Sequence, residues 1–157
     1  MKTEKQIIEQ MPAKEKMLQA CLAKQRQLIA DFNRGIDELA GSGSREEGAD
    51  QPGLVEEVAL RRRQLTDQLS FAKEELKILE DMLPGCNEKH DVVGLGSTVV
   101  TDNGIFYVSV SIERFDAEGM PIFGVSLKSP LYKAMSGKRK GESFAFGPQT
   151  YWIMDVY

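Results

Sequence analysis

Apolar residues recur at steps of three and four along two long stretches of the first half of the chain. The first stretch carries Leu18, Leu22, Ile29, Phe32, Ile36 and Leu39, and the second carries Val55, Val58, Leu65, Leu69, Ala72, Leu76, Leu79 and Leu83. One step is interrupted in each stretch, at Gln25 and at Arg62. This spacing is typical of a narrow seam between paired helices. The pattern therefore predicts two long helices of similar length.

Residues 41–53 separate the two stretches and contain several glycines and Pro52, which end the first helix and let the chain reverse. We therefore predict an antiparallel coiled-coil hairpin with its tip at about 41–56. Each arm of roughly 28 residues would span about 40 Å at about 1.5 Å per residue. A seam that pairs with a partner's helix is an alternative, but the matched arms and short reversal favour self-pairing.

The second half of the chain has a different pattern, with short runs of β-branched and aromatic residues after Pro84 and Gly85. These runs predict strands over 97–101, 105–112, 122–127, 143–146 and 151–156. Residues 102–104 (Asp-Asn-Gly) and 116–119 are predicted turns. The expected fold class is α+β, with a helical hairpin over 1–85 and a small β-rich domain over 91–157.

One short helix interrupts the predicted strands. Ser129 is a suitable N-cap, Pro130 fits the first helical position, and Gly137 fits the position after the last turn. The N-terminal residues 3–11 stay undecided, because Pro12 can end one helix or begin the next.

Composition and charge limit the function. The 157 residues are 41% hydrophobic and 28% charged, as in a folded soluble protein, and the polar N-terminus leads us to expect a cytoplasmic location without a membrane span. The net charge of -4, with basic residues spread along the chain, favours a protein partner over nucleic acid. Arg61, Arg62 and Arg63 fit a solvated helix face, with RNA or an acidic wall as the alternative contact.

Metal and thiol chemistry have few candidate residues. Cys21 and Cys86 are too far apart for a zinc or redox pair, and Cys21 lies on the apolar stripe and is expected in the core. His90, the single histidine, is expected to be a solvated linker residue.

Residues 129–142 read Ser-Pro, an apolar helical turn, Gly137-Lys138, two variable residues, Gly141 and an acid. This segment resembles the C-terminal signature of the Gre transcript-cleavage factor family without a gap. The resemblance covers about residues 92–157, and the predicted hairpin matches that family in architecture. The resemblance implies an FKBP-like C-terminal domain that grips the rim of the secondary channel of RNA polymerase through Ser129, Pro130, Gly137 and Lys138.

In that family the hairpin enters the channel, and the tip acids hold a second Mg²⁺ and orient water so that the polymerase cuts its own backtracked RNA. The resemblance thus implies a monomer without catalytic residues or an intrinsic cofactor, whose partner is RNA polymerase and which meets RNA only indirectly. One or two carboxylates on a rigid arm can supply oxygen ligands to such a cation.

The family's tip motif reads Asp-Leu-x-Glu-Asn-x-Glu-Tyr, whereas residues 53–60 read Gly-Leu-Val-Glu-Glu-Val-Ala-Leu. Only Glu56 carries over as a metal ligand. Asp50, Glu46 and Glu47 lie in the same loop and are candidates to replace the lost acid, with Asp50 as the expected second metal ligand. Glu46, Glu47 and Glu57 are further tip acids. The alternative role of Glu56 and Glu57 is to interact with the positive end of the helix dipole at the start of the second arm. Lys128 stands where an acid or amide often precedes the family's Ser-Pro turn.

Two other functions remain open. A Gre-related protein with this tip can occupy the channel as a regulator that does not stimulate cleavage. The second alternative is an FKBP-type prolyl isomerase, in which Trp152, Phe144 and Phe146 would line an apolar pocket instead of packing in the core.

Overall fold

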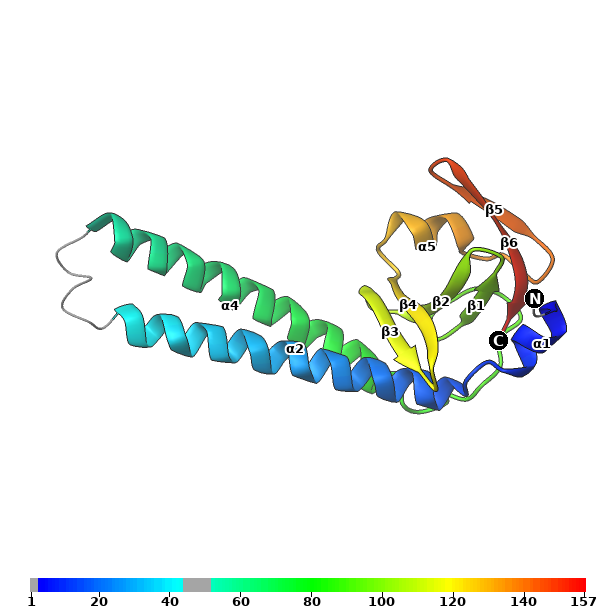
Figure 1. Cartoon of the computed structure of the whole chain (residues 1–157), viewed down its shortest axis with the longest axis horizontal. Helices are drawn as coiled ribbons and strands as arrows, with labels where there is room; N and C mark the ends of the chain where they lie inside the picture. Colours follow the sequence, from blue (N-terminus) through cyan, green and yellow to red (C-terminus); the bar gives the residue numbers. More distant parts are fainter. Residues whose placement is uncertain (1–2, 44–51) are drawn as a thin grey trace. The chain divides into compact units, whose positions relative to one another are not determined.

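A computed structural model describes residues 3–43 and 52–157 and has an α+β fold (Figure 1). The helices are α1 (Glu4–Glu9), α2 (Lys14–Gly43), α4 (Pro52–Asp81) and α5 (Pro130–Met135), and the strands are β1 (Thr98–Thr101), β2 (Gly104–Ser109), β3 (Ile112–Ala117), β4 (Met120–Ser126), β5 (Ser143–Phe146) and β6 (Gln149–Val156). The chain divides into two compact units. The helical unit is Ala23–Lys77, and the sheet unit combines Met1–Leu22 with Ile78–Tyr157.

Within the helical unit, α2 and α4 run antiparallel and pack against each other (Figure 1). Gln25 reaches the backbone of Ala72, and a Cβ placed on Gly35 would lie 3.3 Å from Cδ1 of Leu65. Contacts therefore move toward the start of α4 as α2 proceeds, which is the antiparallel order. The two predicted helices and their pairing are confirmed, and each is 30 residues long.

Burial along the seam is uneven. Leu65, Leu69 and Ala72 of α4 and Gln25 of α2 are buried, whereas Val55 near the start of α4 is exposed. In the sheet unit, Leu18, Leu22, Cys21 and Leu79 are buried as predicted, and Leu83 is exposed because α4 ends before it. Val55 is thus part of the seam without being buried in it, since it lines a groove together with Leu39 of α2, whereas the prediction of Leu83 as a residue of the helical seam was wrong.

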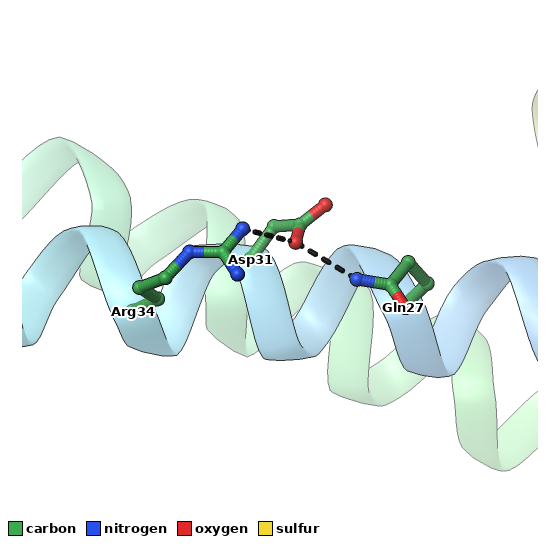
Figure 2. Close-up of polar contacts among 3 residues, drawn as sticks. All are labelled: Gln27, Asp31 and Arg34. Atoms are coloured by element: carbon green, nitrogen blue, oxygen red, sulfur yellow. Dashed lines mark hydrogen bonds and ion pairs between the residues drawn. The ribbon is translucent and has the colours of Figure 1, made fainter.

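The solvent-exposed face of α2 carries a group of three polar side chains in contact over two helical turns. Figure 2 shows the side chains of Gln27 and Arg34 both directed at Asp31. The Gln27 amide donates to Oδ1 of Asp31 at 2.9 Å, and the Arg34 guanidinium lies 2.7 Å from the same oxygen. Pairs three and four residues apart stabilise an exposed helix by about 0.2–0.5 kcal/mol each. These exposed pairs thus stabilise α2 in a region where the narrow seam buries few apolar side chains.

The six strands form one mixed sheet in the order β3-β4-β2-β1-β6-β5, in which β2 and β4 pair in parallel and all other neighbours are antiparallel. The run predicted over 105–112 is in fact two strands, since β2 ends at Ser109 and β3 begins at Ile112. Gly124 of β4 lets the link between β2 and β3 pass close to the backbone of β4. A Cβ there would lie 2.6 Å from the carbonyl oxygen of Val110, so only glycine fits.

Both predicted turns form. The backbone of Glu118 and Gly119 has positive φ, 51° and 80°, between β3 and β4. Between β1 and β2, the Thr101 hydroxyl accepts from the Asn103 amide at 3.1 Å and donates to the Gly104 carbonyl at 2.7 Å. Positive φ falls on Gly104, not on Asn103, so the side chain of Thr101 fixes this turn.

One face of the sheet is covered by α5 and forms the main core of the sheet unit. Its buried members are Val93, Val99, Phe106, Val108, Val125, Met135, Phe144, Ile153 and Val156. Phe144 stacks on Tyr151 with ring centroids 4.9 Å apart. The N-terminal residues left undecided by the sequence form α1, which Thr3 and Gln6 close with a capping box. In the described ranges, no helix has both the length and the apolar content needed to cross a bilayer.

Candidate functional site

The Ser-Pro turn begins α5 as predicted. The Ser129 hydroxyl accepts a hydrogen bond from the Tyr132 amide at 3.1 Å and donates one to the Ser126 carbonyl at 2.9 Å. Pro130 is the first helical residue, where its missing N–H costs nothing. The half-buried Ser129 thus ties the start of α5 to the end of β4, and Pro130 stays exposed.

The Gly-Lys end of the same segment is fixed by backbone bonds. Gly137 has φ 75°, and its N–H donates to the Val93 carbonyl at 3.2 Å. The Val93 N–H in turn donates to the Lys138 carbonyl at 2.9 Å. These bonds hold Lys138 against the segment before β1, so Ser129, Pro130, Gly137 and Lys138 belong to one ordered turn-helix-turn. Capping and turn geometry alone account for their residue types.

Apolar side chains are exposed in the chain that leads into α5. Phe123 of β4 and Leu127 after it are 41% and 43% exposed, and the Lys128 side chain is exposed beside them. Exposed apolar residues next to an ordered turn are common at protein–protein contacts. The sequence patterns did not single out Phe123 or Leu127, because each lies in a run that reads as strand interior.

The start of α4 carries the second part of the candidate site. Glu56 and Glu57 are exposed and follow the first helical turn, which contains no acid. Stabilisation by the helix dipole falls off within the first turn, so it accounts for these two carboxylates only weakly. Glu46, Glu47 and Asp50 lie outside the described residues, and the predicted pairing of Asp50 with Glu56 stays a prediction.

The two exposed carboxylates have donor chemistry that fits Mg²⁺, which prefers oxygen ligands in an octahedral set. No group of three or more histidine, cysteine or acidic residues suited to a metal occurs in the described part of the chain. Two carboxylates cannot fill an octahedral set, so a cation bound by Glu56 and Glu57 would take its other ligands from water or from another molecule.

Beside these acids, the helical unit has an open groove of about 560 Å³ between α2 and α4. Its lining includes the apolar Leu39, Val55 and Val58 and the charged Arg62 and Arg63. The interrupted step of the second stripe, Arg62, is the sequence signal for this groove. The arginines of the basic run thus differ: Arg62 and Arg63 line the groove, whereas Arg61 does not belong to its lining.

His90 is not the solvated linker residue expected from the sequence. Its Nδ1 lies 2.8 Å from the Ser97 hydroxyl, and its side chain is half-buried. Burial lowers the pKa of His90, and the nearby Lys14 ammonium lowers it further. The expectation failed because Asn87 and Glu88 hydrogen-bond the first residues of α2 and Ser97 hydrogen-bonds His90, so the segment before β1 is tied to the fold.

No family model and no curated protein matches the chain. The candidate site therefore rests on two features of this molecule. One is the ordered turn at α5 with its exposed apolar neighbours. The other is the pair of acids at the start of a long antiparallel hairpin.

The three aromatic residues named for an isomerase pocket do not share a face. In the β5–β6 ladder, Ser143 pairs with Trp152 and Phe144 pairs with Tyr151. Paired residues share a face and neighbours alternate, so Trp152 lies opposite Phe144 and Phe146. Phe144 is buried, whereas Trp152 is 43% exposed. No specific observation here favours the isomerase.

Proposed function

We propose that this protein is a Gre-like transcription elongation factor that binds RNA polymerase through the rim of its secondary channel and stimulates cleavage of backtracked RNA. The observation that carries the proposal is the 129–142 segment, whose Ser-Pro cap, short helix, left-handed Gly137 and following Gly141 agree with the family's signature. In this proposal the sheet unit has an FKBP-like fold, and the protein acts as a monomer in the cytoplasm.

The sheet unit supplies the contact with the polymerase. Ser129, Pro130, Gly137 and Lys138 present a rigid turn, and a rigid surface loses little conformational entropy on binding. The exposed Phe123 and Leu127 add apolar area that association can bury. Lys128 gives this contact a positive charge, so the matching surface of the polymerase would be neutral or acidic.

The hairpin supplies reach. Each 30-residue helix spans about 45 Å at about 1.5 Å per residue, long enough for a narrow arm to enter a channel. The buried bond of Gln25 to the partner helix keeps the arms in register. Glu56 and Glu57 lie at the end of the hairpin where α4 begins, which is where an arm would deliver carboxylates.

The reaction belongs to the polymerase in this proposal. A shared Mg²⁺ would supply Lewis-acid stabilisation of the phosphodiester and a more acidic water. Glu56 would bind that cation through a carboxylate oxygen, and Glu57 would add negative charge beside it. The chain's own task is therefore to place one or two carboxylates and hold them still.

A channel-binding regulator that does not stimulate cleavage is the second candidate. The observation that favours it is the apolar character of the start of α4. Leu54 and Leu60 are 44% and 53% exposed, and Gly53 and Ala59 stand where the family motif has acids. Such a protein would keep the docking surface and lack the full set of carboxylates.

Stalled, backtracked elongation complexes separate the two candidates. We expect the wild-type chain to bind them and shorten their RNA, and the double variant Glu56→Ala/Glu57→Ala to bind equally well but lose the shortening. Glu74→Ala/Glu80→Ala is the matched control, because both acids are exposed on the same helix farther from its start. Binding without shortening by the wild-type chain supports the regulator, and undiminished shortening by the first variant removes these acids from the mechanism.

A further inference from the structure

Lys14, the first residue of α2, is unusual among the lysines in the described part of the chain because its side chain is buried. The residue is only 4% exposed, and its ammonium donates a hydrogen bond to the backbone carbonyl of Glu88. Lysine is almost never fully buried unless a charge partner compensates it. Here the direct acceptor is a neutral carbonyl, so the cation is only partly compensated.

Lys14 lines two cavities. The larger has a volume of about 450 Å³, and Ile8, Met11 and Val156 form its apolar wall. A volume above about 300 Å³ is enough for a small organic molecule. The smaller cavity, of about 200 Å³, is lined by Lys14 together with Cys86 and Tyr107. His90 lines both cavities together with Lys14, and the two side chains interact electrostatically.

Several titratable groups line the larger cavity with Lys14. Lys89, His90 and Asp91 come from the segment that precedes β1, and Asp155 and Tyr157 come from β6 and the residue after it. Lys89 offers a cation to an anionic group in the cavity, whereas Asp91 and Asp155 oppose tight anion binding. A small anionic reagent would therefore bind weakly and reversibly.

The smaller cavity brings Asp81 from the end of α4 and Cys86, Glu88 and Tyr107 near the amine. Burial lowers the pKa of Lys14 to about 8, and this effect exceeds the opposing attraction of Glu88 and Cys86. At pH 7.5 roughly a quarter of such an amine is neutral, against roughly 0.1% of an ordinary lysine. The neutral amine is the nucleophilic form.

We propose that Lys14 is an acylation site, whose amine is acylated by small acyl phosphates that enter the larger cavity. The Nζ lone pair attacks the acyl carbon, a new N–C bond forms, and the C–O bond to phosphate breaks. Phosphate leaves with the bonding electron pair, and the amine releases one proton to His90 or to water. No oxidant or further reactant is needed.

The size of the cavity and the charge of its lining favour a small acyl donor that carries a phosphate group. A lysine that is 4% exposed excludes bulky acylating agents, whereas the smallest acyl phosphate fits a 450 Å³ cavity. Lys89 lies where it can attract the phosphate group. The product amide loses the positive charge and places its acyl group among Ile8 and Met11, which replaces a partly compensated cation by apolar contact.

The test uses the full wild-type chain with acetyl phosphate as the probe and measures acetylation at each lysine by mass spectrometry. Lys16 is the internal control, because it lies two residues along the same helix and is exposed. We expect Lys14 to react about ten-fold faster than Lys16 at pH 7.5. This factor is smaller than the ratio of the neutral fractions of Lys14 and an ordinary lysine, because a weaker base is also a weaker nucleophile. The Lys14 rate should level off above pH about 8.

Two variants separate a cavity-directed reaction from chance exposure. Met11→Trp fills the larger cavity and should slow Lys14 at least about five-fold without changing Lys16. Glu88→Gln removes a negative charge that favours protonation of Lys14, which lowers the pKa of Lys14 further. The acetylation rate of Lys14 in this variant should therefore level off at a lower pH. The proposal is overturned if Lys14 reacts no faster than Lys16, or if its rate rises with pH in parallel with that of Lys16. An unchanged Lys14 rate in a folded Met11→Trp protein also overturns it.

Discussion

The side-chain amide of Gln25 on α2 donates a hydrogen bond to the backbone carbonyl of Ala72 on α4, with 3.0 Å between the two atoms. The same nitrogen lies 3.4 Å from a carboxylate oxygen of Glu75. Both Gln25 and Glu75 are buried in the helical seam. A buried polar group between otherwise apolar layers is satisfied at one register only, so this bond fixes how the two arms align.

We expect Gln25→Ala to lower the free energy of unfolding by about 1–3 kcal/mol, because the Ala72 carbonyl and Glu75 lose a buried donor. Urea unfolding followed by circular dichroism measures the change. Gln27→Ala is the control, since Gln27 bonds Asp31 on the exposed face and should cost about 0.5 kcal/mol or less. Equal effects of the two substitutions would contradict the role given to Gln25.

Gly53→Asp should stabilise α4 and increase RNA cleavage in backtracked complexes. A Cβ on Gly53 meets nothing within 4 Å, and the residue lies in the first turn of α4, where an acid interacts with the helix dipole. The gain in unfolding free energy should be on the order of 1 kcal/mol from helix propensity and charge. Gly53→Asn, which is neutral, should leave cleavage at the wild-type level. Equal cleavage by the two variants would show that a carboxylate at this position has no part in the reaction.

Ser129→Ala should cost about 1 kcal/mol of stability, because the Tyr132 amide loses its capping acceptor. The docking turn should then loosen, and affinity for RNA polymerase should fall several-fold. Ser129→Asn keeps a side-chain acceptor at the N-cap and should retain both stability and affinity. Titration of labelled protein with core polymerase measures the binding. Wild-type affinity in a destabilised Ser129→Ala protein would exclude this turn from the interface.

Stability should pass through a maximum in alkaline solution. Folded Lys14 loses its proton near pH 8 and unfolded lysine near pH 10.5, so between these values the unfolded chain binds more protons and a rise in pH favours the folded state. Burial raises the pKa values of Tyr107 and Tyr157, so above pH about 10 the tyrosines ionise first in the unfolded chain and stability falls. Urea unfolding from pH 7 to 11 should show both limbs.

Lys14→Met supplies the control for the pH prediction. It should remove the rise between pH 8 and 10, which we expect to be on the order of 2 kcal/mol, and keep the fall above pH 10. If the free energy of unfolding still rises between pH 8 and 10 in Lys14→Met, another titratable group is responsible for the rise.

Local chemistry explains which features were predictable from the sequence. The arms of the hairpin, the Ser129 cap, the left-handed Gly137 and the turns at 102–104 and 116–119 depend on neighbouring residues, and all of them form. Such features are set by backbone and capping preferences over a few residues.

Long-range packing explains the features that were missed. The break between β2 and β3 depends on the approach of the Val110 carbonyl to Gly124, which no local pattern reveals. The hydrogen bonds of Lys14 to Glu88 and of His90 to Ser97 depend on how the segment before β1 meets the start of α2 and the sheet. The parallel pairing of β2 with β4 is likewise a property of the whole sheet. Of the candidate site, the α5 turn is confirmed as a structure, whereas its partner is still a prediction.

Binding to a backtracked elongation complex tests the central claim most directly, with the length of the bound RNA read in the same sample. We predict that the wild-type chain binds the bacterial polymerase at its secondary channel and shortens the RNA from its 3′ end. A folded protein that fails to bind the complex, or that binds equally well when the channel is blocked, would contradict the proposed function.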